Sequence, residues 1–68
     1  MVVKVGRAQS GRKTYIVQDG ATVGDALNKA GIILESTDEI FVNSERASKE
    51  TVLSPNANVT ISAMIKGN

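Results

Sequence analysis

The side chains that carry most enzyme chemistry are scarce in this 68-residue chain. It contains neither histidine nor cysteine, so the commonest general base and the thiolate nucleophile are missing. Acidic neighbours occur at Asp38-Glu39, and Glu45 with Glu50 forms a second candidate pair. Such pairs on a small domain are more often solvated charge than acid–base machinery. The chain has no calcium-type loop and no phosphate-binding glycine loop. We therefore expect no enzymatic activity, no metal and no cofactor.

The charged residues are distributed unevenly, although the net charge is only +1. Residues 1–18 hold no acid, whereas all seven acidic residues lie between Asp19 and Glu50. The four cations of the first segment are Lys4, Arg7, Arg12 and Lys13. They form either a solvated hairpin rim or a contact for an acidic partner. Nucleic-acid binding would add Tyr15 as a stacking group, but two aromatic residues make a poor stacking platform, so a nucleic-acid partner is not favoured.

A short helix is predicted from Val23 to Ala30. Thr22 is suited to its N-cap, with Asp25 three residues later as the second half of a capping box. Gly31 is suited to a left-handed C-cap. Apolar residues recur at helical spacing on one face, which should pack on a sheet. They are Val23, Ala26, Leu27 and Ala30.

Four segments have the composition of strands. Residues 2–5 and 14–17 are rich in β-branched side chains and predict a hairpin, and residues 39–42 predict a third strand. Phe41, between Ile40 and Val42, is expected in the core. From Val59 to Lys66 apolar and polar residues alternate, which predicts a last strand with one buried face. Because it is the most regular, we expect it at the centre of the sheet, beside the first strand.

The connections carry turn signals. Residues 32–34 are expected to pass under the sheet as a crossover, and residues 43–46 to form a turn. Residues 49–53 suit a short edge strand or a single turn, and 54–57 form the clearest turn. A chain of this length encloses one core, so residues 1–68 are expected to be a single domain.

This order of elements, together with several short motifs, resembles the β-grasp, ubiquitin-like proteins. The likeness is greatest to the small sulfur carriers of thiamine and molybdopterin biosynthesis and their archaeal ubiquitin-like relatives. It is carried by residues 19–27, 30–32, 41–43 and 53–61. The resemblance implies an α+β fold, with a mixed sheet of four to five strands, one helix packed across it, and the order β-β-α-β-(β)-β. These motifs are mostly structural, so they indicate the fold more specifically than the function.

The C-terminus departs from that family. Sulfur carriers end in Gly-Gly, because the terminal carboxylate must enter the narrow site of an adenylating enzyme before it becomes a thiocarboxylate. This chain ends in Lys66-Gly67-Asn68, and removing Asn68 would leave a single glycine. If the last strand reaches Ile65, the three residues beyond it extend at most about 10 Å.

We therefore expect a small non-catalytic module that binds another protein through its sheet. The expected partner surface is Asn43, Ser44, Glu45, Arg46, Ser62 and Met64. One alternative is a sulfur carrier or protein modifier with an unconventional end, whose partner is a carrier-activating adenylating enzyme and whose tail is Lys66, Gly67 and Asn68. A second is nucleic-acid binding by the basic hairpin. The sequence has no apolar run long enough to span a membrane, so we expect a cytoplasmic protein with no membrane partner.

Overall fold

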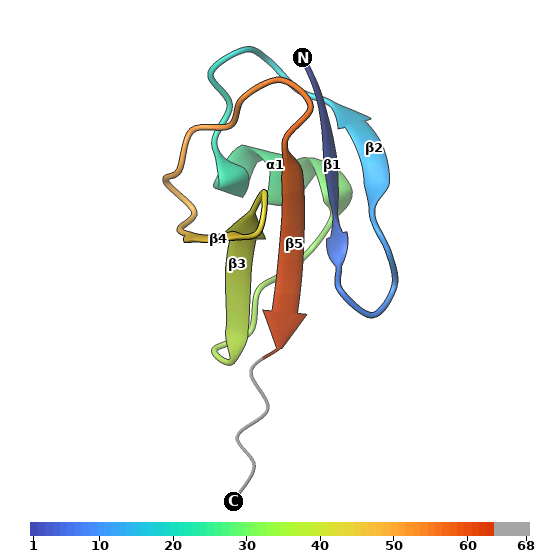
Figure 1. The fold of residues 1–68 in the computed structure, drawn as a ribbon, viewed down its shortest axis with the longest axis vertical. Coiled ribbons are helices and arrows are strands. Elements are labelled where there is room, and N and C mark those ends of the chain that lie inside the picture. Colours follow the sequence, from blue (N-terminus) through green and yellow to red (C-terminus); the bar gives the residue numbers. More distant parts are fainter. Residues whose placement is uncertain (64–68) are drawn as a thin grey trace, which may run out of the picture.

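The computed structural model describes residues 1–63. They form five strands and one helix (Figure 1). In chain order the elements are β1 (Val2–Arg7), β2 (Lys13–Ile16), α1 (Val23–Ala30), β3 (Asp38–Val42), β4 (Glu45–Ala47) and β5 (Asn58–Ala63). The expected succession of elements is confirmed, and the optional fourth strand is present.

Strand β5 lies at the centre of the sheet, as its alternating sequence predicted. The strand order is β2-β1-β5-β3-β4. Strands β1 and β5 run parallel, while the other neighbouring pairs are antiparallel. The sheet is therefore mixed, and segments from opposite ends of the chain lie side by side in its middle (Figure 1).

Helix α1 begins and ends at the residues that the capping pattern predicted. The Thr22 hydroxyl accepts a bond from the Asp25 amide at 3.3 Å, and the Asp25 carboxylate accepts one from the Thr22 amide at 3.0 Å. At the other end Gly31 has a φ of 73°, in the left-handed region, and its N–H donates to the Asn28 and Leu27 carbonyls. Both ends of this short helix are thus fixed by local bonds.

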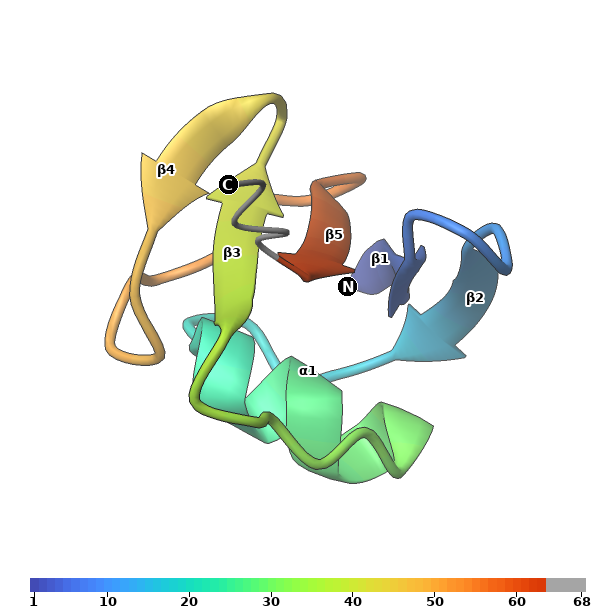
Figure 2. The same ribbon diagram turned by 90° about the horizontal axis from the view of Figure 1, so that it is seen from below.

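The core lies between α1 and one face of the sheet, which we call the helix side (Figure 2). It is built from Val3, Val5, Ile40, Val59 and Ile61 of the strands and Val23, Ala26 and Leu27 of the helix. Val3 and Val5 of β1, with Val59 and Ile61 of β5, are at most 1% exposed. Because strand side chains alternate, the intervening residues point to the opposite face, which no described helix covers.

The short fourth strand is not where the sequence placed it. The predicted turn at 43–46 is confined to Asn43 and Ser44, which both have positive φ values, 52° and 74°. Such a two-residue turn joins strands tightly, so Glu45 and Arg46 belong to β4. The 49–53 segment forms no strand, and the alternative of a single turn holds there, because the Thr51 amide donates to the Ser48 carbonyl at 3.2 Å. An isolated bridge joins Val52 to Thr22.

The crossover prediction is also wrong in part. Ile32 and Leu34 are half-buried against the core, whereas Ile33 between them is 82% exposed. The segment therefore runs along the margin of the core and turns one side chain outward. The prediction for the end of the last strand, beyond Ala63, lies outside the described residues.

Strand β1 is two residues longer than predicted, because Gly6 and Arg7 pair with Thr60 and Ile61 of β5. The hairpin loop folds closely over Gly6. A Cβ atom at this position would collide with the Gly11 carbonyl oxygen and lie 2.8 Å from the Arg12 Cα atom. Gly6 is thus required by a close approach of backbone to backbone.

This contact gives a stability prediction. We expect Gly6→Ala to lower the free energy of unfolding by about 1–3 kcal/mol, as for other overpacked sites. Gly24→Ala is the control, because its Cβ would meet the Lys49 carbonyl at an ordinary 3.5 Å. It should leave stability unchanged or raise it by up to about 1 kcal/mol, since alanine favours helix more than glycine does. Urea unfolding measures both, and a Gly6→Ala protein as stable as the native one would contradict the close approach.

Candidate functional site

The face of the sheet opposite α1, which we call the open face, gathers polar and charged side chains around one aromatic ring. Its members are Lys4, Arg12, Glu39, Phe41, Arg46, Asn58, Thr60 and Ser62. The strand register places them in rows. Arg46 of β4 is opposite Phe41 of β3, which is opposite Thr60 of β5.

Phe41 is on the open face and not in the core, so our expectation for this residue is wrong. Its neighbours Ile40 and Val42 pair with Ile61 and Val59 on the helix side, and alternation turns the ring the other way. The ring is half-buried. The alternation of side chains along β3 could have predicted that Phe41 faces away from the core. It was not visible in the sequence, because Ile40, Phe41 and Val42 are all apolar.

The guanidinium of Arg46 covers the Phe41 ring, with its carbon 5.9 Å from the ring centroid. This distance is within the range of a cation–π contact. Arg46 also forms an ion pair with Glu39 at 3.3 Å. Since the Arg46 side chain is still 64% exposed, it remains available to a partner.

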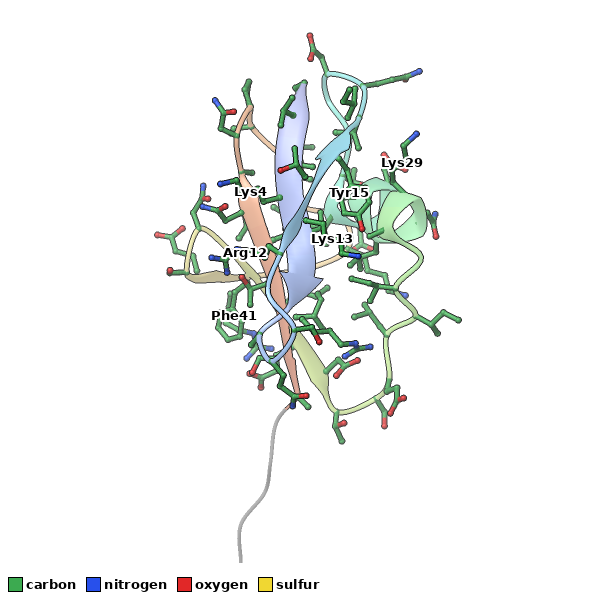
Figure 3. All side chains as sticks on the ribbon, turned by 90° about the vertical axis from the view of Figure 1, so that its right-hand side faces the viewer. Lys4, Arg12, Lys13, Tyr15, Lys29 and Phe41 are labelled. Atoms are coloured by element: carbon green, nitrogen blue, oxygen red, sulfur yellow. The ribbon has the colours of Figure 1, made fainter. Side chains whose placement is uncertain are left out.

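Arg12 reaches the open face from the hairpin loop. Its Nη1 donates to the Thr60 hydroxyl at 2.9 Å, across 48 residues of sequence. Lys4, Arg12 and Phe41 lie on the same side of the sheet in Figure 3, away from the helix. Thr60, which is opposite Phe41, is the residue that Arg12 contacts, so both guanidinium groups reach the same row of the sheet. Sequence reasoning missed this grouping because it depends on how the loop folds over Gly6.

The expected partner surface is brought together only in part. Arg46 and Ser62 are on the open face, beside Phe41 and Glu39. Asn43 is used structurally, because its Oδ1 accepts the Asn58 amide bond at 2.9 Å. Ser44 is exposed at the tip of the turn. Glu45 pairs with Val42, whose side chain packs toward the core, so it lies on the other side. Met64 lies outside the described residues, as do Lys66, Gly67 and Asn68.

The four cations of the hairpin do not form one patch. Lys4 and Arg12 are on the open face, whereas Lys13 lies on the helix side (Figure 3). Arg7 is also on the helix side, where it donates to Asp38 at 3.1 Å and to the Ile33 carbonyl at 3.0 Å. This arrangement gives no support to nucleic-acid binding by the hairpin.

The Arg7–Asp38 ion pair links β1 to the start of β3. The Asp38 side chain is 3% exposed, and its Oδ2 also accepts the Glu35 amide at 2.9 Å. The bond from Glu35 lowers the pKa of Asp38, burial opposes this effect, and the bond and charge of Arg7 lower the pKa further. The net result is a pKa below the ordinary 3.8.

Within residues 1–63 no three acidic side chains come close enough to hold a metal ion. Across the same described part of the chain, no helix has the length and apolar character to cross a membrane.

Comparison with solved structures identifies the architecture as the β-grasp fold of ubiquitin-like proteins, which confirms the expected fold class. The chain is similar to SAMP1 from Haloferax volcanii, with a TM-score of 0.81 and 17% identity over 100% of both chains. It is likewise similar to a crystal structure of H. volcanii small archaeal modifier protein 1. That match has a TM-score of 0.77 and 16% identity, over 94% of this chain and 98% of the other. No family model and no curated protein matches the sequence.

The Asp38 carboxyl gives a pH prediction. Its folded pKa is below 3.8, so the stability it contributes is fully present above that pH and is lost as pH falls through the folded pKa. We expect Asp38→Asn to be less stable at pH 7 and to lose less stability than the native protein between pH 5 and pH 2. Urea unfolding across this range measures the difference. An unchanged pH dependence in Asp38→Asn would contradict the assignment.

Proposed function

We propose that this protein is a non-catalytic, ubiquitin-like module that binds another protein through the open face of its sheet. The observation that carries the proposal is the position of Phe41, which lies outside the core, beneath the guanidinium of Arg46 and opposite Thr60, the residue that Arg12 contacts. Aromatic and arginine side chains are the types that most often dominate binding energy at protein interfaces. Here they are grouped on a face that the helix leaves uncovered.

The geometry suits a docking surface. The strands hold Phe41 and Thr60 on a rigid sheet, so little conformational freedom is lost there on binding. The ring is half-buried, and a partner that covered the rest of it would remove apolar surface from water. The Arg46 contact would also strengthen as water is excluded.

The charge of the open face favours an acidic partner. Lys4, Arg12 and Arg46 are positive, and Glu39 is the one carboxylate among the open-face residues defined above. Complementary charge increases the rate of association and rejects basic partners. We therefore keep the hypothesis of an acidic partner, but assign its contact to the open face instead of the whole basic hairpin.

Photocrosslinking in the native cell tests the proposal. A photoreactive phenylalanine at position 41 should crosslink to a distinct partner. The same group in place of Ile33, an 82% exposed residue on the helix side, is the control and should not capture that partner. Adding Arg12→Glu to the position-41 protein should lower the yield, because it reverses one charge at Thr60, the residue opposite position 41.

Binding of the crosslinked partner in purified form gives the quantitative test. Phe41→Ala should weaken it by at least about tenfold, as expected for the centre of an interface, while Ile33→Ala should leave it within about twofold. Capture from position 33 alone, or equal affinity of Phe41→Ala and the native protein, would exclude the open face as the docking surface.

A second candidate function is that of a carrier or protein modifier. The specific observation in its favour is the likeness, over 100% of both chains, to a protein that is named a small archaeal modifier. Such a role needs an activated C-terminal carboxylate, supplied by a carrier-activating adenylating enzyme. The sequence reads Lys66-Gly67-Asn68 where the sulfur carriers have Gly-Gly.

Intact-mass measurement of the protein from its native cell separates the two functions. The binding-module proposal predicts an unmodified chain ending at Asn68, and no adenylation by a carrier-activating enzyme from the same cell. A variant in which Gly-Gly replaces Gly67-Asn68 serves as the positive control for the adenylation assay. A thiocarboxylate, a shortened tail or a conjugate attached through the C-terminus would instead establish the carrier or modifier role.

A further inference from the structure

The crossover, residues 32–34, carries the most exposed large apolar side chain among residues 1–63. This side chain is Ile33, which is 82% exposed, while its two neighbours are half-buried against the core. In Figure 2 the segment runs back along α1 on its way to β3. The alternation continues to Glu35, which is exposed. Ile33 and Glu35 therefore both point away from the core.

Hydrogen bonds hold the backbone around Ile33. The Ile32 amide donates to the Leu27 carbonyl at 3.0 Å, and the Ile33 carbonyl accepts a bond from the Arg7 guanidinium at 3.0 Å. The chain is thus fixed just before and just after the Ile33 side chain. Little conformational freedom would be lost when a partner covers this side chain.

A hollow of about 320 Å³ lies beside Ile33, between α1 and the crossover. The helix contributes Gly24, Leu27 and Asn28 to its lining, and the crossover contributes its own apolar side chains. Lys49 is the one charged residue of the lining. One face of the molecule thus holds an apolar projection and a partly apolar hollow next to each other.

A second copy of the chain fits this face, because the face carries both halves of a complementary contact. In a two-fold arrangement the Ile33 side chain of one copy enters the hollow of the other, and symmetry supplies the reciprocal contact. A projection and a hollow on different faces would instead join copies head to tail. Their position on a single face therefore favours a closed pair of copies.

The charges beside the projection and the hollow have opposite signs. Glu35 follows Ile33 on the exposed side of the segment, and Lys49 lines the hollow. Within residues 1–63 neither side chain forms an ion pair. When Ile33 enters the hollow of a second copy, Glu35 comes near the Lys49 of that copy, and the symmetry repeats this pair. The charges of the face are thus complementary to the face itself.

We propose that this face, made of residues 32–35 and the hollow, is an interface between two copies of the chain. Ile33 is its apolar anchor, and the two Glu35–Lys49 pairs set its orientation. Because the face is small, its interface belongs to the weak class that buries less than about 1,200 Å². We expect a dissociation constant on the order of 0.1–1 mM.

The dimer leaves the open face of each copy uncovered, because the helix lies between the interface and the sheet. A target with two binding segments could then engage both open faces, with a gain in avidity. The dimer interface is separate from the open-face site around Phe41, so either proposal can fail without the other. A photoreactive group at position 33 would capture a second copy, which its mass distinguishes from the open-face partner.

Sedimentation equilibrium of the full chain tests the anchor. We expect a dimer fraction that rises with protein concentration up to about 1 mM. Ile33→Ala should weaken association at least about tenfold, because it truncates the central apolar side chain. Ile16→Ala is the matched control, since Ile16 is 71% exposed on an edge strand of the sheet. It should leave association within about twofold.

A charge exchange tests whether a second copy is the occupant. Glu35→Lys and Lys49→Glu each place like charges across both contacts, and each should weaken association about tenfold at low salt. The double variant restores both pairs and should associate like the native chain. An equimolar mixture of the two single variants should form a mixed dimer, because each copy supplies the charge that the other lacks.

Three results would overturn the proposal. The first is a monomer up to about 1 mM, with no concentration-dependent shift of the Ile33 and Lys49 amides in ¹⁵N NMR. The second is a dimer that Ile33→Ala leaves intact, which would place the interface elsewhere. The third is weakened association in the single charge variants that neither the double variant nor the mixture restores. All three substituted side chains are exposed, so the variants should fold, and circular dichroism checks this.

Discussion

The parallel pairing of β1 with β5 is the constraint on which the rest of this structure depends. It joins the two ends of the chain in the middle of the sheet and brings four residues, Val3, Val5, Val59 and Ile61, to at most 1% exposure. Their burial against α1 is the main source of stability in so short a chain. Because strand side chains alternate, the same pairing sends Lys4, Asn58 and Thr60 to the opposite face.

The two sides of the sheet consequently carry different roles. On the helix side the charged residue Arg7 donates to Asp38 and to a backbone carbonyl, so it links β1 to the segment that leads into β3. On the open face Arg46 covers an aromatic ring and Arg12 bonds to the neighbouring Thr60, and the Arg46 side chain remains largely exposed. Residues of the same type thus serve the fold or are available to a partner according to the side they occupy. The face formed by α1 and the crossover adds a surface of a third kind, where an apolar side chain projects beside a hollow.

Local features of the sequence were sufficient for part of this architecture. Thr22, Asp25 and Gly31 determine the helix ends through bonds within a few residues, and the alternation of β5 reflects its central place. The position of Phe41 could not be obtained in this way, because it depends on the register between β3 and β5. The contact of Arg12 with Thr60 likewise requires the loop to fold over Gly6. The position of β4 was missed because Asn43 and Ser44 adopt positive φ values, which shorten the turn.

The central claim is that the sheet separates a structural side from a binding side at two adjacent residues, Ile40 and Phe41. Urea unfolding of Ile40→Ala and Phe41→Ala tests it most directly. Ile40 is 7% exposed in the core, so its truncation should lower the free energy of unfolding by about 2–5 kcal/mol. Truncation of the larger Phe41 side chain should cost less than half as much, because the ring packs on the open face. An equal or greater loss for Phe41→Ala would show that the ring supports the fold and would contradict the account.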